Sequence, residues 1–168
     1  MDFDIDALYA ALDEQRRTLG LTWPQVAREI SGQFERVPVR SIATSTITGM
    51  RKRRVIEGDG VLQMLRWLGR APEDFVPGHR QSAPSAALPH VARGRILRFD
   101  VPAIYAAIDA RRTQRAMTWA EVAREIGGVS VTGLTRMAKG GRTAFPLIIR
   151  IARWLGRPVA SLTHIVDW

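Results

Sequence analysis

Acidic side chains near the start of the chain have a spacing that would suit calcium. Four aspartates imitate the alternating carboxylates of a calcium-binding loop, namely Asp2, Asp4, Asp6 and Asp13. Such a loop needs glycine at its sharp turn, and Ala7 stands in that place. The same stretch fits the beginning of a helix, so we predict that it holds no metal ion.

Side chains that carry catalysis or bind transition metals are few and scattered. The sequence has no cysteine, and its three histidines lack the spacing of metal ligands (His79, His90 and His164). The glycine-containing stretches 58–60 and 140–143 fit neither phosphate-binding loop pattern. Paired carboxylates, a nucleophile elbow and a cofactor motif are also missing from the sequence. We therefore expect no catalytic residue, no metal and no cofactor, and a protein that is not an enzyme.

Basic side chains offer a different chemistry, the binding of an anionic partner. The chain has 25 Lys and Arg against 16 Asp and Glu, a net charge of +9. All of these basic residues except Lys52 and Lys139 are arginine, whose planar guanidinium donates paired hydrogen bonds to phosphates and base edges. Residues 1–88 hold 12 basic and 11 acidic side chains, whereas residues 89–168 hold 13 and 5. The second half therefore carries nearly all of the excess charge.

The chain contains two copies of one sequence unit. Shifted by 96 positions, residues 3–30 overlay residues 99–126, and 15 of these 28 positions are identical. Shifted by 87 positions, residues 46–54 overlay residues 133–141, and the pentapeptide RWLGR at 66–70 recurs. These matches indicate a tandem duplication.

The offsets of the two matches locate an insertion and a linker. Because 96 − 87 = 9, the first copy carries nine extra residues, roughly within 31–40. Residues 78–95 are rich in Pro, Ala, Ser and Gly and have no periodicity, which is typical of a flexible linker. We predict one domain at residues 1–77, the linker at 78–95 and a second domain at 96–168, with the two domains folding separately.

Both copies have the pattern of short helices. Apolar residues recur at helical spacing in each copy, and no segment alternates like a strand. Thr118 with Glu121, and Thr22 with Gln25, have the spacing of a capping box at the start of a second helix. Each copy is predicted to hold five helices, so the fold class is all-α. Further predicted elements are a third helix from about Ser130 to Lys139, fourth helices that end at Gly69 and Gly156, and last short helices at 72–76 and 158–163.

The helical pattern of the second copy resembles a known family. Residues 118–156 read TWAEVAREIGGVSVTGLTRMAKGGRTAFPLIIRIARWLG, a capped second helix, a turn, a third helix with a basic end and an apolar fourth helix. This stretch resembles the lambda-repressor/Cro-like helix-turn-helix family, particularly its compact actinobacterial-style members. The first copy has the same frame. The resemblance implies two tandem lambda-repressor-like helix-turn-helix domains.

The resemblance also implies which residues read DNA bases. The family docks its third helix in the major groove, where early exposed positions touch base edges. Methyl groups of Val and Thr suit thymine, and Arg136 suits guanine. Gly49 replaces that arginine in the first copy, so the first copy is expected to discriminate less. The implied base-reading residues are Ser130, Val131, Thr132, Thr135 and Arg136 in the second copy, and Thr44, Ser45 and Thr48 in the first.

Phosphate contacts are implied in the same way. The family places the end of its third helix against the DNA backbone. Backbone amides at the start of the second helix can in addition hold a phosphate, as helix N-termini do. Family members often have glutamine just after that start, whereas both copies here have tryptophan, Trp23 and Trp119. The implied phosphate-binding residues are Arg51, Lys52, Arg53, Arg54, Lys139 and Arg142, together with the helix starts at Thr22 and Thr118.

Two functions from different classes remain open on the sequence. The first is sequence-specific binding of double-stranded DNA by a transcriptional regulator that uses both units on adjacent major grooves. The alternative is a protein-interaction adaptor, favoured by the near-neutral first half, Gly49 and the insertion. A steep salt dependence of DNA binding would favour the first. A homodimer or a protein partner is left open.

The remaining sequence features bear on location. No stretch approaches 18 uninterrupted apolar residues, so no membrane-spanning helix and no membrane partner are expected. The first residues are acidic, where a secretory signal would be basic and then apolar. We expect a cytoplasmic protein that is nucleoid-associated when bound to DNA.

Overall fold

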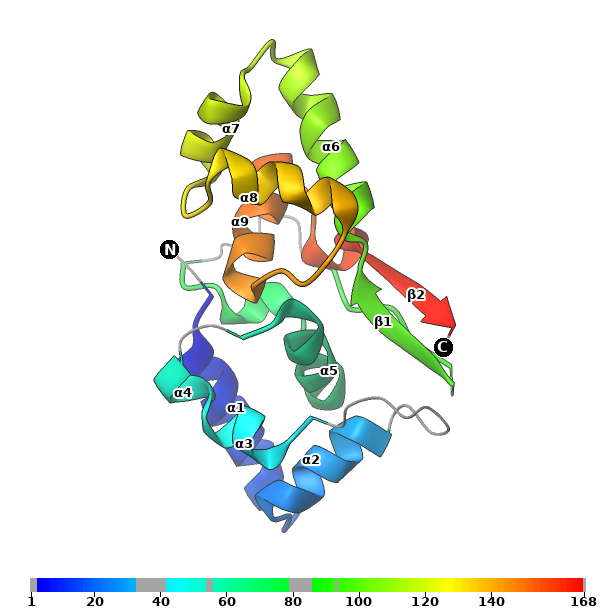
Figure 1. Cartoon of the computed structure of the whole chain (residues 1–168). Coiled ribbons are helices and arrows are strands. Elements are labelled where there is room, and N and C mark those ends of the chain that lie inside the picture. Colours follow the sequence, from blue (N-terminus) through cyan, green and yellow to red (C-terminus); the bar gives the residue numbers. More distant parts are fainter. Residues whose placement is uncertain (1–2, 33–41, 54–55, 79–85, 93, 168) are drawn as a thin grey trace.

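The computed structural model describes residues 3–32, 42–53, 56–78, 86–92 and 94–167. The described chain is mainly helical and has a small two-stranded sheet (Figure 1). Among the described residues, no helix has the length and apolar composition needed to cross a membrane. The first half comprises α1 (Ile5–Thr18), α2 (Trp23–Gly32), α3 (Thr44–Thr48), α4 (Met50–Arg53), α5 (Gly58–Leu68) and the 3-10 helix η1 (Pro72–Phe75). The second half comprises β1 (Arg95–Phe99), α6 (Val101–Gln114), α7 (Trp119–Ile126), α8 (Val131–Arg136), the 3-10 helix η2 (Met137–Lys139), α9 (Phe145–Leu155), the 3-10 helix η3 (Val159–Leu162) and β2 (Thr163–Asp167).

Local hydrogen bonds determine where the helices begin and end. The carboxylate of Asp4 caps α1 and that of Asp100 caps α6, each by accepting a backbone N–H three residues further on. Gly69 and Gly156 follow α5 and α9 in the left-handed conformation, with φ of 65° and 68°. These two glycines confirm the predicted ends of the fourth helices, because that conformation strains a residue with a side chain.

One hydrophobic core runs through both halves. α5 and α9 lie at the centre of the molecule, with α1 and α2 on one side and α6 and α7 on the other (Figure 1). Leu62 and Leu65 of α5 and Ile148 and Ile151 of α9 are fully buried. The buried apolar residues of the two halves form a single contiguous cluster. The two copies therefore pack against each other.

The contact between the halves has approximate twofold symmetry. Glu57 and Ala144 form an isolated antiparallel bridge, and they are equivalent positions of the repeat at the shift of 87. Gly58 donates its N–H to the carbonyl of Thr143 at 2.9 Å, and the equivalent Phe145 N–H donates to the carbonyl of Ile56 at 3.1 Å. Each bond is the mate of the other under exchange of the copies. A pseudo-twofold axis thus passes between the segments that lead into α5 and α9.

Packing beside this axis departs from exact symmetry. The ring of Phe3 meets the ring of Phe145 edge-on, with centroids 4.6 Å apart. In the pair related to this one by the repeat, Phe99 corresponds to Phe3 and Gly58 to Phe145. Phe99 lies against Gly58, where an added Cβ would stand 2.9 Å from the Phe99 ring. A large side chain on one side of the axis is therefore matched by glycine on the other.

Polar contacts between the halves reinforce the packed interface. Gln63 of α5 donates its side-chain N–H to the carbonyl of Leu97 at 2.8 Å, in a buried position. Glu73 is buried, and its Oε1 accepts the backbone N–H of Val159 at 2.7 Å. These contacts tie η1 and α5 to β1 and η3. Because such bonds are specific in direction, they hold the halves in one relative orientation.

Two predictions from the sequence are wrong. The fold is not all-α, because β1 and β2 pair antiparallel with Ile96 opposite Val166. Ile96 and Leu97 are both buried, so β1 lacks the one-sided alternation that marks a strand. The halves are also not separate bodies on a flexible linker, because they share one core. Within the predicted linker, Val91 is buried, while residues 79–85 and 93 lie outside the described part, as does most of the predicted insertion.

Candidate nucleic-acid interface

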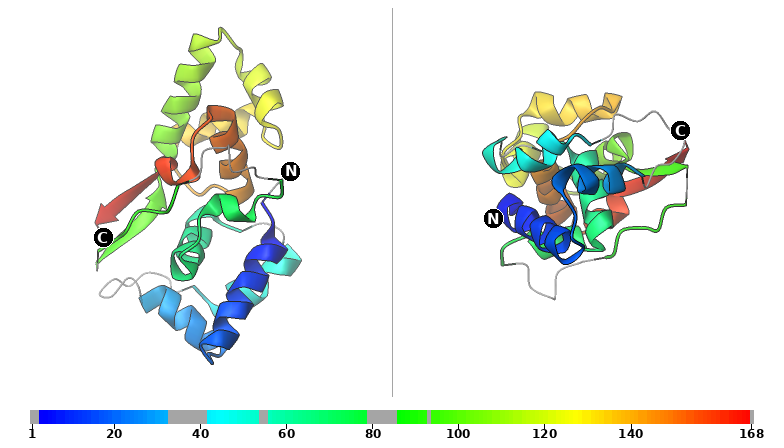
Figure 2. Two further views of the ribbon diagram at one scale, coloured as in Figure 1. Left: turned by 180° about the vertical axis from the view of Figure 1, so that it is seen from behind. Right: turned by 90° about the horizontal axis from the view of Figure 1, so that it is seen from below.

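The two helices assigned to base reading lie on one face of the molecule. α3 and α8 both face the viewer in Figure 1 and lie in the upper part of the right-hand view of Figure 2. In the left-hand view of Figure 2, which is seen from behind, both are on the far side. α3 and α8 are equivalent in the repeat at the shift of 87. The duplication thus gives one chain two equivalent short helices on one surface.

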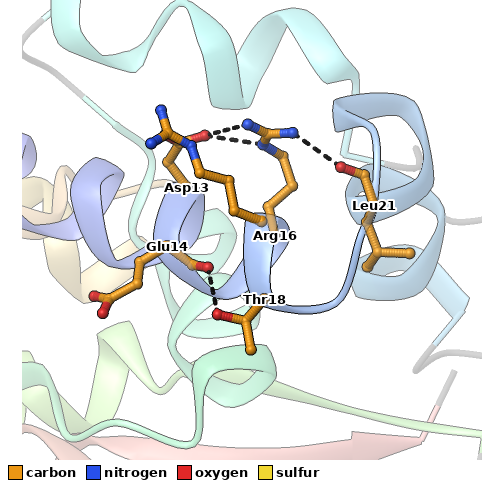
Figure 3. A network of polar contacts seen from close by, with 6 residues as sticks. Asp13, Glu14, Arg16, Thr18 and Leu21 are labelled. Carbon is orange, nitrogen blue, oxygen red and sulfur yellow. Dashed lines mark hydrogen bonds and ion pairs between the residues drawn. The ribbon is translucent and has the colours of Figure 1, made fainter.

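An arginine hydrogen-bond network, repeated in both halves, positions α2 before α3 and α7 before α8. Arg16 donates to the Asp13 carboxylate through Nε at 2.9 Å and Nη2 at 2.7 Å, and through Nη1 to the carbonyl of Leu21 at 2.9 Å (Figure 3). Leu21 lies in the turn between α1 and α2, so these bonds set the direction of the chain as it enters α2. In the second half, Arg112 makes the same contacts with Asp109 and Met117.

Trp23 and Trp119 pack against the preceding helix in equivalent positions of the two halves. The ring centroids of Trp23 and Tyr9 lie 5.2 Å apart, and Trp119 stacks on Tyr105 with the same distance between centroids. The guanidinium carbon of Arg16 lies 5.0 Å from the ring centroid of Trp23, and that of Arg112 lies 5.0 Å from the ring centroid of Trp119. These stacks fix the first residue of α2 and of α7 against the preceding helix. Both indoles are half-buried, with one partner ring and one guanidinium already against them, which favours packing over stacking on a base.

α8 carries the base-reading residues predicted for the second half. Ser130 is its N-cap, and its Oγ accepts the N–H of Gly133 at 3.0 Å. Val131, Thr132 and Arg136 are exposed, and Thr135 is half-buried. The structure thus brings all five predicted residues together at one short helix, while Leu134 on the opposite side is buried in the core.

α3 carries the corresponding residues of the first half. Ser45 and Thr48 are exposed and Thr44 is half-buried, while Ile47 points into the core. Ala43 occupies the N-cap position and supplies no side-chain hydrogen bond. The third helix of the first half is interrupted at Gly49, which separates α3 from α4. The helix that carries the predicted base-reading residues, α3, therefore ends at Thr48.

The basic residues of the first half are only partly available. Arg51 pairs with Asp6 at 2.9 Å and lies over the ring of Tyr9 at 5.4 Å. Lys52 is exposed on α4. Sequence reasoning missed Asp6 as a partner because it lies 45 residues away in α1. The side chain of Arg53 and all of Arg54 lie outside the described residues.

The second half presents its basic residues differently. Lys139 ends η2 and is exposed, directly after α8. Arg142 is exposed and pairs with Glu57 of the first half at 3.2 Å. This ion pair crosses the pseudo-twofold axis, which no pattern within one copy could reveal. Exposed ion pairs such as Arg142–Glu57 and Arg51–Asp6 are weak, so the guanidiniums of Arg142 and Arg51 remain able to meet another anion.

The two helix starts differ in charge. Thr118 forms the full capping box with Glu121, which accepts both the N–H and the hydroxyl of Thr118. These hydrogen bonds lower the pKa of Glu121, so a carboxylate occupies the start of α7. At the start of α2, Thr22 instead donates to the neutral amide oxygen of Gln25. A phosphate therefore meets no local negative charge at α2 but meets one at α7, which weakens the prediction for Thr118.

The described residues contain no group of three or more His, Asp or Glu side chains that could hold a metal ion. His164 instead pairs with Asp100, at 3.1 Å between Nδ1 and Oδ2. Comparison with known proteins adds no identification, because no family model, curated protein or solved structure matches this chain.

Proposed function

We propose that this chain binds double-stranded DNA with sequence specificity, as a transcriptional regulator in the cytoplasm. In this proposal α3 and α8 enter neighbouring major grooves on one side of a duplex. One chain then does what two subunits of a symmetric dimer would do, and each half contacts one half-site.

The observation that carries the proposal is the placement of α3 and α8 on a common face about the pseudo-twofold axis (Figures 1 and 2). Duplex DNA has local twofold axes perpendicular to its own axis, so a protein with a matching axis can meet equivalent grooves with equivalent helices. A tandem repeat that served two unrelated partners would have no need of this arrangement.

The shared core adds a constraint on the DNA. Because the halves are fixed to each other, the two half-sites must lie at one spacing, expected to be about one turn of DNA, or roughly 34–36 Å. A flexible tether would tolerate several spacings at similar affinity. Spacing dependence is therefore a direct consequence of the interface between the halves.

Charge supports the same partner. Arg136, Lys139 and Lys52 are exposed at or directly after the two reader helices. The net charge of +9 favours a polyanion and predicts a binding constant that falls steeply with salt. Arg136 on α8 forms no ion pair within the described part of the chain, and it is the residue best suited to a guanine edge.

The test is selection of bound sequences from random duplexes with the full chain, followed by measurement of affinity for the selected site at several salt concentrations. We expect two half-sites at one spacing, and insertion of two base pairs between them should remove specific binding. Failure to enrich any sequence, or binding that ignores spacing, would contradict the proposal.

A matched pair of variants makes the test sharper. Arg136→Ala should weaken binding to the selected site by about 1–3 kcal/mol and relax the preference at one base position. Arg17→Ala removes the same charge from α1, which lies on the opposite face (Figure 2). Arg17 is exposed, and among the described residues its ion-pair partner is Asp13. This control should leave the base preference unchanged.

A role for the first half in binding a partner protein is the second candidate. The pairing of Arg51 with Asp6 favours it, because a guanidinium already matched by a carboxylate adds less to phosphate binding. If this candidate were correct, neutralising Lys52 and Arg51 together would leave the salt dependence of DNA binding unchanged.

A further inference from the structure

We infer that α8 recognises the C5 methyl group of a pyrimidine in the major groove, whereas α3 recognises polar base edges. This inference rests on the proposed function and deepens it by naming the chemical group read at the second half-site. Thymine and 5-methylcytosine are the two bases that carry this group.

Two of the three hydroxyl groups at α8 and its N-cap are hydrogen-bonded within the helix, whereas Thr132 is exposed and its hydroxyl forms no hydrogen bond within the described part of the chain. Ser130 Oγ accepts the N–H of Gly133 at 3.0 Å as the N-cap. Thr135 Oγ1 donates to the carbonyl of Val131 at 3.1 Å, with a second contact to the carbonyl of Thr132 at 3.3 Å. A hydroxyl proton engaged with its own backbone is not free to donate to a base edge, so Thr135 can present only its methyl group and an acceptor oxygen.

Val131 is the apolar group that this arrangement presents. Its side chain is 39% exposed at the first position of α8, and it is one of three large hydrophobic residues exposed in the described chain. The other two, Leu19 and Ile165, lie away from the reader helices, after α1 and in β2. An isopropyl group on the face that carries Arg136 gains energy only by covering another apolar surface, and a pyrimidine methyl is the apolar group of the major groove.

Val131 and Thr135 also lie on the same strip of the helix. They are four residues apart, so their side chains are neighbours on the α8 surface. The two isopropyl methyls and the threonine methyl thus make one small apolar patch. Arg136 lies on the adjoining strip of the helix, four residues after Thr132, and in the described part of the chain no hydrogen bond or ion pair engages its guanidinium.

α3 is more polar than α8 at the equivalent of Val131, although Thr48 Oγ1 donates to the carbonyl of Thr44 at 3.1 Å as Thr135 Oγ1 does to that of Val131. Thr44 replaces Val131 and Ser45 replaces Thr132 at the shift of 87. Within the part of the chain that the structure describes, neither of these two hydroxyls forms a hydrogen bond. Both are therefore available to donate to or accept from a base edge, and the two half-sites are expected to differ in sequence.

The experiment uses the full chain and the selected duplex. The half-site of α8 is identified first, as the one at which Arg136→Ala relaxes a base preference. Each thymine in that half-site is then replaced singly by deoxyuridine, which removes only the methyl group. Burial of one methyl group predicts that a single replacement lowers affinity about fourfold.

Variants of Val131 assign this effect to the residue. Val131→Ala should abolish the difference between thymine and deoxyuridine at that position, and Val131→Ile should keep it. Thr44→Ala in α3 is the matched control and should leave the difference unchanged. Thermal unfolding of each variant checks that the exposed substitution does not disturb folding.

A further arm separates the two sources of the methyl group. The critical thymine pair is replaced by a cytosine pair, with or without the 5-methyl group. Recovery of affinity with 5-methylcytosine would show that the methyl group is read on either base, and no recovery would restrict recognition to thymine.

Two results would overturn the inference while leaving the proposed function intact. One is specific binding that no deoxyuridine replacement in the α8 half-site affects. The other is a methyl effect that Val131→Ala retains. If no sequence is selected at all, the proposed function fails and the inference falls with it.

Discussion

Substitution of Gly58 by alanine tests the interface between the two halves most directly. Gly58 begins α5 beside the pseudo-twofold axis and donates its N–H to the carbonyl of Thr143. A Cβ added there would stand 2.9 Å from two carbons of the Phe99 ring and 2.9 Å from the Thr143 carbonyl oxygen. The ring can turn, but the carbonyl belongs to the backbone of the other half. The two halves would therefore have to move apart.

The expected cost follows from overpacking. Forcing an additional carbon into a filled interior destabilises a protein by about 1–3 kcal/mol. Gly60→Ala in the same helix is the matched control, because its added Cβ meets nothing within 4 Å. Alanine has the higher helix propensity, so this control should stabilise the protein by about 0.5–1 kcal/mol. The two substitutions thus change stability in opposite directions.

Urea denaturation of the two variants and the parent chain measures the difference. Since the halves share one core, we expect a single cooperative transition, with Gly58→Ala shifting the midpoint down at an unchanged slope. A Gly58→Ala protein as stable as Gly60→Ala would refute the described interface. Two separate transitions in the parent chain would contradict the shared core itself.

Two further predictions concern the capping box and the buried carboxylate. Hydrogen bonds from Thr118 hold the pKa of Glu121 below its ordinary value of 4.5, so their stabilising effect is present above that pH and is lost as the pH falls below it. Melting temperatures measured from about pH 6 to pH 3 should therefore fall less for Glu121→Gln than for the parent. Glu73→Ala leaves the N–H of Val159 without its acceptor and should cost about 1–3 kcal/mol in urea denaturation. Glu73→Gln, which keeps an acceptor oxygen, should cost less, and equal losses would contradict this role.

Local features of the fold could be read from the sequence. Gly69 and Gly156 end the helices where predicted, and Thr118 with Glu121 forms the predicted capping box. These features depend on residues a few positions apart, whose geometry is nearly independent of the rest of the chain. The five residues predicted for the second reader also come together on α8, because they lie within one short segment.

Features that depend on distant residues could not be read in this way. Glu73 and Val159 are 86 residues apart, and nothing in either segment indicates that they meet. Arg51 likewise pairs with Asp6, which is 45 residues away, and this pairing reduces the positive charge that Arg51 adds beside α3. The sequence did not predict β1 because the neighbours Ile96 and Leu97 are both buried, so apolar and polar residues do not alternate along the strand. Tertiary packing determines each of these outcomes.

The pairing of Gly58 with Phe99 on one side of the axis, and of Phe145 with Phe3 on the other, has a consequence for how such a protein can change. In a dimer of identical subunits every substitution occurs twice, so glycine and phenylalanine could not occupy the same position at once. Fusion of the two copies removes this restriction, and each half can vary alone. For a protein that binds DNA, the target is then free to depart from a palindrome one base pair at a time, without a second kind of subunit.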